Sequence, residues 1–167
     1  MDICVDFDGT CVTHAFPKVG EDIGAVPVLK ELVENGHNLI LFTMRSNVSD
    51  NTGFSAEVPE IHNGNFLDDA INWFKENDIP LYGIQENPTQ KNWTTSPKAY
   101  GQMYIDDAAL GCPLCIKVSN HTGTHIVSYW APAEKSMKKH WKFIDRPFVD
   151  WKTLRDIFVG REMIKEK

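Results

Sequence analysis

The sequence predicts an α/β protein built on a parallel sheet that is covered by helices. Short apolar runs that suit buried strands, at residues 3–5 and 39–42, alternate with stretches of helical periodicity. The clearest helical stretches, 27–35 and 66–77, each follow such a run and precede another. Alternation of strand and helix favours a parallel sheet, because parallel neighbours need a long crossover that packs on the face of the sheet.

The first half of the chain supplies a strand, a helix and a second strand. Residues 3–5 form the first strand, and a helix is expected from Pro27 to Asn35. Pro27 suits a first helical turn, and Gly36 suits the left-handed position just after a helix end. The continuous apolar run at 39–42 suits a strand that is buried on both faces.

The second half is expected to continue the alternation. A helix over Phe66–Asn77 precedes Pro80, which stops it. Further strands are expected at 81–84, before Asp106, and at 114–118, with a last helix beginning at an Asp150 N-cap. Residues 119–144 are interpreted as an insertion with a turn and an extra strand near 126–130.

Composition limits the class of protein. The chain has 167 residues, of which 42% are hydrophobic and 24% are charged, so one soluble globular domain over residues 1–167 is expected. The net charge of −6 argues against a general nucleic-acid binder. Neither a membrane-spanning run nor a signal peptide is visible, so we expect a cytoplasmic protein with four reduced cysteines and no membrane association.

Two aspartates at the end of the first strand are the strongest functional signal. Asp6 and Asp8 follow an apolar strand, and residues two apart on extended chain point the same way. Gly9 allows a sharp turn and a close approach of backbone N–H groups to a ligand. Because ligands bind at the carboxyl ends of strands in open α/β sheets, this loop is a candidate site.

Two later strands end in residues of matching chemistry. Thr43 follows the apolar run 39–42, and Asp106-Asp107 follows Met103-Tyr104-Ile105. Carboxylate oxygens suit Mg²⁺, which keeps several waters and needs few protein ligands. Arg45 is either a bidentate donor to a substrate phosphate or carboxylate or a solvated loop residue, and both readings stay open.

The ordered set Asp6-Phe7-Asp8-Gly9-Thr10, Thr43, Lys98 and Asp106-Asp107 resembles the motifs of the haloacid dehalogenase (HAD) superfamily, over roughly residues 2–116. The resemblance implies a three-layer, Rossmann-like fold with strand order 5-4-1-2-3. It also implies that Asp6 is the nucleophile, Asp8 the acid–base group, and Thr43 and Lys98 the phosphoryl-holding residues. Lys91 is the alternative lysine.

The same resemblance implies the remaining site residues. Gly9, Thr10, Met44 and Arg45 would bind substrate. Mg²⁺ would be held by Asp6, the Asp8 carbonyl and Asp106, with Asp107 on the metal or its waters. No segment is long enough for a cap domain, so a bulky substrate or a lid from a partner subunit is expected, and an oligomer is possible.

The expected function is therefore a Mg²⁺-dependent phosphomonoesterase that forms an aspartyl-phosphate and acts on a phosphorylated substrate of unknown class. The alternatives are a phosphotransferase and a non-catalytic HAD-like binding or regulatory protein. A zinc site built from Cys112, Cys115, His121 and His125 is not expected. His14 is expected to face solvent, with contact to the leaving group as the alternative, and the basic run 135–142 to be a solvated face.

Overall fold

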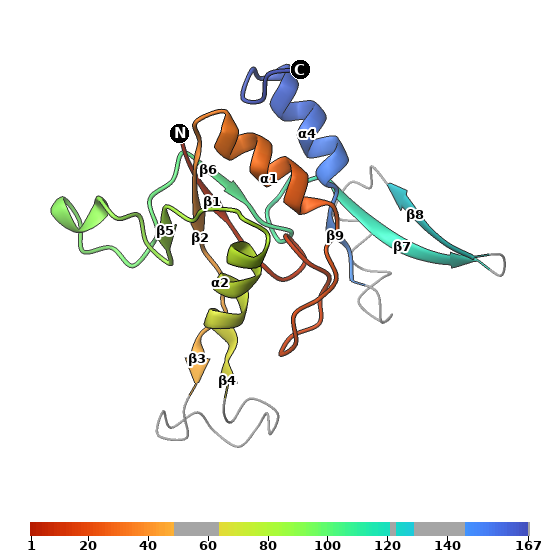
Figure 1. Cartoon of the computed structure of the whole chain (residues 1–167), viewed down its shortest axis with the longest axis horizontal. Helices are drawn as coiled ribbons and strands as arrows, with labels where there is room; N and C mark the ends of the chain where they lie inside the picture. The colour runs from red at the N-terminus through yellow and green to blue at the C-terminus, as the bar shows by residue number, and fades with distance from the viewer. Residues whose placement is uncertain (49–63, 121–122, 129–145, 167) are drawn as a thin grey trace.

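The computed structural model describes residues 1–48, 64–120, 123–128 and 146–166. Its centre is a parallel sheet of β1 (Asp2–Val5), β2 (Asn38–Leu41), β5 (Gly83–Ile84) and β6 (Met103–Ile105), in the order β5-β2-β1-β6 (Figure 1). Strand β1 pairs with β2 and with β6, so Val5 lies beside both Leu41 and Ile105.

Helices cover one face of this sheet. They are α1 (Ala25–Glu34), α2 (Phe66–Glu76) and α4 (Trp151–Gly160). Their buried side chains join one hydrophobic core with Ile3 and Val5 of β1 and Leu39 and Leu41 of β2. This arrangement follows from right-handed crossovers, since the chain moves from β1 to β2 to β5 in one direction and keeps its helices on one side.

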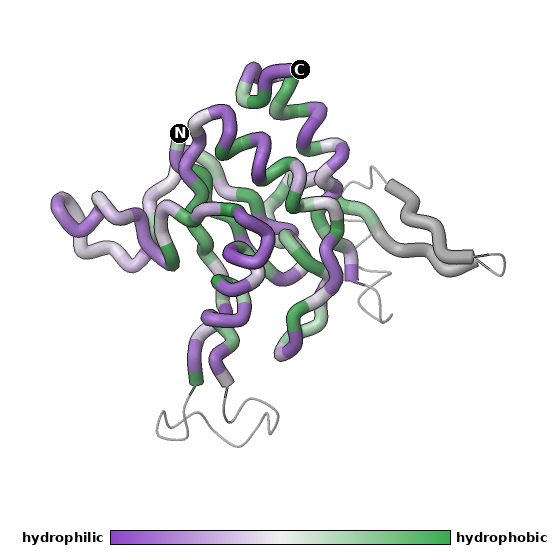
Figure 2. The backbone as a smooth tube through the Cα atoms, viewed as in Figure 1, coloured by the Kyte–Doolittle hydropathy of each residue, from purple (hydrophilic) through white to green (hydrophobic). Residues whose placement is uncertain are grey.

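The opposite face is covered by irregular chain. Cys4 and Ile40 point to this side and form a small buried cluster with Ala99. The connection from β5 to β6 contains only a short 3-10 turn, η2 (Gln90–Asn92), and is mostly hydrophilic, whereas the central strands are hydrophobic (Figure 2). In the described residues the third layer of the predicted fold is thus a loop rather than helices.

The predicted fifth strand does not join the parallel sheet. β7 (Leu114–Asn120) pairs antiparallel with β8 (Gly123–Ser128) and with β9 (Phe148–Val149), and these three form a separate sheet. The predicted order 5-4-1-2-3 is therefore wrong at its first position. Residues 106–113, which connect β6 to β7, are fewer than the dozen or so that a parallel crossover needs.

The helices begin and end near the predicted residues. The helices predicted at 27–35 and 66–77 are present within two residues at either end. The Asp150 carboxylate accepts a hydrogen bond from the Thr153 N–H, which confirms the predicted N-cap of α4. Two short strands of two residues each, β3 (Asn47–Val48) and β4 (Gly64–Asn65), pair antiparallel between β2 and α2 and were not predicted. None of the described helices combines the length and apolar character needed to cross a membrane.

Candidate metal and catalytic site

Three carboxylates meet at the carboxyl edge of the parallel sheet. Asp6 follows β1, and Asp106 and Asp107 follow β6, which lies beside β1. One oxygen of each can be chosen so that all three lie within 4.8 Å of one another. The strands that precede Asp6, Thr43 and Asp106 are neighbours, as the predicted strand order requires. The three carboxylates together could hold a metal ion.

The electrostatics of Asp6 reflect this crowding. The pKa of Asp6 is raised to about 7, chiefly by burial and also by the nearby carboxylates of Asp106 and Asp107. Hydrogen bonds from the Phe7 backbone and the Thr43 side chain lower the pKa of Asp6 in part. Without a cation, the ionised form of Asp6 is therefore disfavoured, as expected for a group that shares its surroundings with like charges.

The loop that carries Asp6 is braced from the far end of the chain. The Trp151 indole N–H donates to the Thr10 carbonyl at 2.6 Å, and the Val149 N–H donates to the Gly9 carbonyl at 2.8 Å. The Thr10 hydroxyl accepts from the Asp107 N–H at 3.1 Å and lies 3.5 Å from an Asp6 oxygen. Thr10 is fully buried, so it joins the two acidic segments rather than facing a substrate.

Gly9 is required by its surroundings. Its φ is +79°, and a Cβ at this position would lie 2.3 Å from His14 Nε2 and 2.9 Å from Asp107 Cγ. His14 Nε2 lies 3.3 Å from an Asp107 oxygen and 3.1 Å from the Pro147 carbonyl oxygen. The hydrogen bond to Asp107 is the main cause that raises the pKa of His14. His14 is half-buried against the acidic group, so the expectation of a solvent-facing histidine is wrong.

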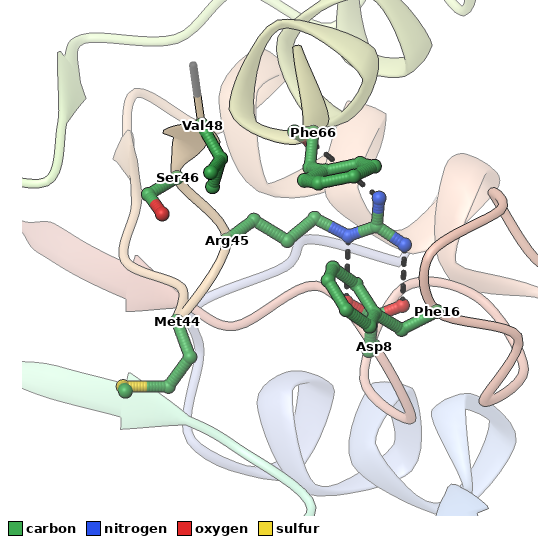
Figure 3. Close-up of a pocket in the computed structure, with 7 residues that line it drawn as sticks. All are labelled: Asp8, Phe16, Met44, Arg45, Ser46, Val48 and Phe66. Atoms are coloured by element: carbon green, nitrogen blue, oxygen red, sulfur yellow. Dashed lines mark hydrogen bonds and ion pairs between the residues drawn. The ribbon is translucent and has the colours of Figure 1, made fainter. Parts of the chain in front are cut away.

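Asp8 lies apart from the other carboxylates, paired with Arg45 (Figure 3). Arg45 Nε and Nη2 donate to the two Asp8 carboxylate oxygens at 2.6 and 2.7 Å. The other donors reach the carbonyl oxygens of Lys18 at 2.7 Å, Pro17 at 3.3 Å and Phe66 at 3.5 Å. All five N–H groups of the guanidinium are thus directed at acceptors within the protein.

This arrangement contradicts the reading of Arg45 as a solvated loop residue and gives its donors partners within the protein. The side chain is 2% exposed, so it is not a solvated loop residue. Its donors are taken, so it has none left for a substrate phosphate. The guanidinium also lies 5.0 Å from the Phe7 ring centre and 5.2 Å from that of Phe16, which adds cation–π attraction. Arg45 instead holds Asp8, the loop at residues 17–18 and the start of α2 together.

Thr43 stands at the end of β2, as predicted, and its loop is held by a residue that the sequence did not single out. The Gln85 amide donates to the Thr43 carbonyl at 2.6 Å and to the Arg45 carbonyl at 3.2 Å, and its oxygen accepts from the Thr43 N–H at 3.0 Å. Gln85 has φ of 61°, which is uncommon outside glycine. This unusual backbone turns the amide toward the Thr43 loop.

The predicted lysines are not in contact with the acidic group in the described residues. Lys98 Nζ lies 5.0 Å from the centre of the Tyr104 ring, two residues before Asp106, and Lys91 is paired with Glu86 at 2.7 Å. The N–H groups of Gly9 and Thr10 donate within their own loop, to the carbonyls of Val12 and Phe7. The predicted substrate-binding role of Gly9 and Thr10 therefore has no free donor in this arrangement.

Met44, a predicted substrate-binding residue, is 98% exposed and directly follows Thr43 in the chain. The zinc prediction involves His121, which lies outside the described residues, as does the basic run 135–142. The four cysteines are free thiols.

Trp151 and Gln85 are the residues that sequence reasoning missed. A buried Trp needs an acceptor for its N–H, and this was the one signal that pointed from Trp151 to another part of the chain. Gln85 carried no signal, because a glutamine after a short strand is ordinary. Trp151 donates to the Thr10 carbonyl and Gln85 to the Thr43 carbonyl. Such contacts depend on which loops the fold brings together.

Fold and site together define an α/β protein with an acidic group at the carboxyl edge of a parallel sheet. The solved structure of a conserved protein from Bacteroides thetaiotaomicron is similar: the two are 30% identical, the match covers 86% of this chain and 93% of that one, and the TM-score is 0.51. The chain therefore belongs to the same family as that conserved protein. No protein-family model and no curated protein matches the chain.

Proposed function

We propose that this protein is a Mg²⁺-dependent phosphomonoesterase of the HAD type. The observation that carries the proposal is the meeting of Asp6, Asp106 and Asp107 at the ends of two adjacent parallel strands. Thr43 follows β2, which lies beside β1, and its side chain helps to lower the pKa of Asp6. A carboxylate nucleophile, acidic metal ligands and a hydroxyl at one sheet edge suit transfer of a phosphoryl group.

The acidic group fits a hard divalent cation. Its ligand atoms are all carboxylate oxygens, which Mg²⁺ prefers over nitrogen or sulfur. Burial and the neighbouring carboxylates raise the pKa of Asp6, and a bound divalent ion would favour its anionic form. When bound, Mg²⁺ would be held by Asp6 and Asp106, with Asp107 beside it, and would neutralise charge between the nucleophile and the phosphoryl oxygens.

Asp6 is the nucleophile in this proposal. One of its oxygens attacks phosphorus, the bond from phosphorus to the leaving oxygen breaks, and an aspartyl-phosphate forms. Thr43 and the nearby Met44 N–H would hold a phosphoryl oxygen in line. Water then attacks phosphorus, the bond to Asp6 breaks, and inorganic phosphate leaves with the Asp6 carboxylate restored.

Asp8 is assigned the two proton transfers. It gives a proton to the departing oxygen and takes one from the attacking water. Arg45 occupies one lone pair of each Asp8 oxygen, and each oxygen keeps a second one for the proton. The guanidinium also fixes the direction in which the carboxylate points, so Arg45 is a positioning residue.

Hydrolysis of an aryl phosphate tests the proposal. We expect turnover with Mg²⁺, none after EDTA treatment, and recovery when Mg²⁺ is added back. Asp106→Asn should reduce turnover on the order of 10²-fold or more, whereas Asp68→Asn, an exposed acid on α2, should leave it unchanged. Phosphoenzyme trapped by rapid acid quench would identify Asp6. No turnover with any monoester in the presence of Mg²⁺ would favour a binding or regulatory protein.

The lysine assignment has a matched pair of variants. If Lys98 leaves the Tyr104 ring to reach a bound phosphoryl group, Lys98→Met should reduce kcat/KM on the order of 10²-fold. Lys91→Met should change kcat/KM less than about twofold, because Lys91 forms an exposed ion pair with Glu86 instead. Equal, small effects of both variants would remove lysine from the proposed site.

A further inference from the structure

The cavity beside Asp8 is built for an uncharged, apolar group. It has a volume of about 340 Å³ and opens next to the Asp8–Arg45 pair (Figure 3). Phe16, Val48 and Phe66 contribute apolar walls, and Met44 and Ser46 complete its lining. A protein cavity of about 150 Å³ can already hold a benzene ring, so this space suffices for a ring with substituents.

The polar base of the cavity is neutral and satisfied. Both Asp8 oxygens accept from Arg45, and the remaining Arg45 donors point to backbone carbonyls. Among the described residues that line the cavity, Asp8 and Arg45 are the charged ones, and their charges cancel. A second phosphate or a carboxylate would lose water here and find no free donor, since the Arg45 N–H groups are already engaged, and the hydroxyls of a sugar would lie against the apolar walls.

The apolar walls are held in place. Phe16 and Phe66 pack edge to face with ring centres 5.2 Å apart, and the Arg45 guanidinium lies over the Phe16 ring. A Cβ on Gly64 would lie 2.2 Å from the Phe66 ring, so the glycine makes room for that ring. These contacts come from the loop at 16–17, the paired strands β3 and β4 and the start of α2, which together shape the cavity before any ligand arrives.

We propose that this cavity binds the leaving group of the substrate, and that the substrates are phosphomonoesters of an uncharged apolar alcohol, such as an aromatic one. This inference rests on the proposed function, in which Asp8 serves the leaving oxygen and the leaving group must lie on the Asp8 side. The cavity that Asp8 lines is therefore the place where that group sits, and its apolar walls define the class.

Benzyl phosphate and glycerol 3-phosphate test the preference, because both lose a primary alkoxide and differ in polarity. We expect kcat/KM to be about 10- to 100-fold higher for benzyl phosphate, the gain expected for burying a phenyl ring. Val48→Asp should abolish the preference. Val19→Asp, which makes the same change at a partly exposed valine outside the cavity, should keep it, as should the conservative Val48→Ile. A ratio near one in the wild type would overturn the inference while leaving phosphatase activity in place.

A binding measurement separates the cavity from the chemistry. In the presence of Mg²⁺, benzylphosphonate should bind about 10- to 100-fold more tightly than methylphosphonate, and Val48→Asp should remove the difference. If neither phosphonate binds, the proposed function fails, and saturation-transfer NMR with benzyl alcohol decides about the cavity alone. Transfer that is seen with the wild type and Val19→Asp and lost in Val48→Asp supports the cavity. No transfer with the wild type overturns it.

Discussion

Two aspartates, two residues apart in one loop, are treated in opposite ways by the fold. Asp6 lies with two other carboxylates, and its pKa is raised to about 7 by burial and by those neighbours. Asp8 lies against a buried guanidinium that engages both of its oxygens. The protein thus supplies a cation to Asp8, whereas the group that contains Asp6 could hold a metal ion.

The difference shows that the Asp8 side of the site is already paired in the folded protein, whereas the Asp6 side is not. The Asp8 side is complete in the folded chain, since Arg45 ties it to the loop at 17–18 and to α2. The Asp6 side collects like charges, an arrangement that costs stability until a divalent ion arrives. Variants of Asp6 and Asp106 should therefore change activity and metal dependence, whereas loss of Arg45 should chiefly lower the stability of the fold.

The largest effect is expected from Asp6→Asn. Loss of a nucleophile reduces turnover on the order of 10⁴- to 10⁶-fold.

Asp8→Asn should reduce turnover by ~10²–10⁴-fold, more for alkyl than for nitrophenyl phosphates, because an alkoxide needs a proton to leave. Initial rates with both substrate types measure this contrast. Residual turnover of Asp6→Asn close to that of the wild type would remove Asp6 from the nucleophile role.

Arg45→Met should destabilise the fold by about 3–5 kcal/mol, because a partly buried Asp8 carboxylate would lose its partner. Chemical denaturation at pH 7 measures the change. Arg155→Met is the matched control: Arg155 also donates twice to one carboxylate, that of Glu31, but the pair is more exposed. It should cost far less. Similar losses for the two variants would show that burial of the Asp8–Arg45 pair adds nothing.

The pH dependence of stability should reveal Asp6. The pKa of Asp6 rises from 3.8 to about 7 on folding, so the folded protein without metal binds more protons than the unfolded chain in this range. Stability should therefore fall as pH rises from about 4 to 7, by at most about 4 kcal/mol from this group. Asp6→Asn should lack this contribution and be more stable than the wild type at pH 8 in EDTA.

Added Mg²⁺ sharpens the same test. It should raise the Tm more at pH 8 than at pH 5, because the carboxylates must lose protons to bind it. At 100 times the Kd, a bound ion stabilises by about 2.7 kcal/mol. Asp106→Asn should weaken this response, and Asp68→Asn should not. A Tm rise that is equal at both pH values in the wild type would mean that Mg²⁺ binds elsewhere.

The smallest effect, on the stability of the fold, is expected from substituting two glycines with nearly equal φ angles. Gly9 has φ of +79° and Gly36 has φ of +82°, but a Cβ on Gly36 meets nothing within 4 Å. Gly36→Ala should cost about 1 kcal/mol for the left-handed backbone alone. Gly9→Ala should cost more, because it also displaces His14 and Asp107, and it should weaken the Mg²⁺ response. Thermal unfolding of both variants measures the difference, and equal losses would exclude the proposed crowding at Gly9.

Much of the fold could be predicted from local pattern. The strand ending before Asp6, the helices after residues 24, 65 and 150, and the strand ending before Asp106 are all present. They follow from apolar runs, helical periodicity and capping residues, which depend on neighbours in the sequence. Nothing local shows that β7 pairs antiparallel in a second sheet, or that one face of the central sheet is covered by a loop.

By itself, the sequence determined that Asp6, Thr43 and Asp106 stand at strand ends of an α/β fold, because strand length and polarity are local properties. Only the tertiary structure decided what surrounds each of them. Arg45 reaches Asp8 across 37 positions, and Trp151 reaches Thr10 across 141. Such contacts depend on which loops the sheet order brings together. Whether a carboxylate is paired with a cation or lies beside other carboxylates depends on its neighbours in space.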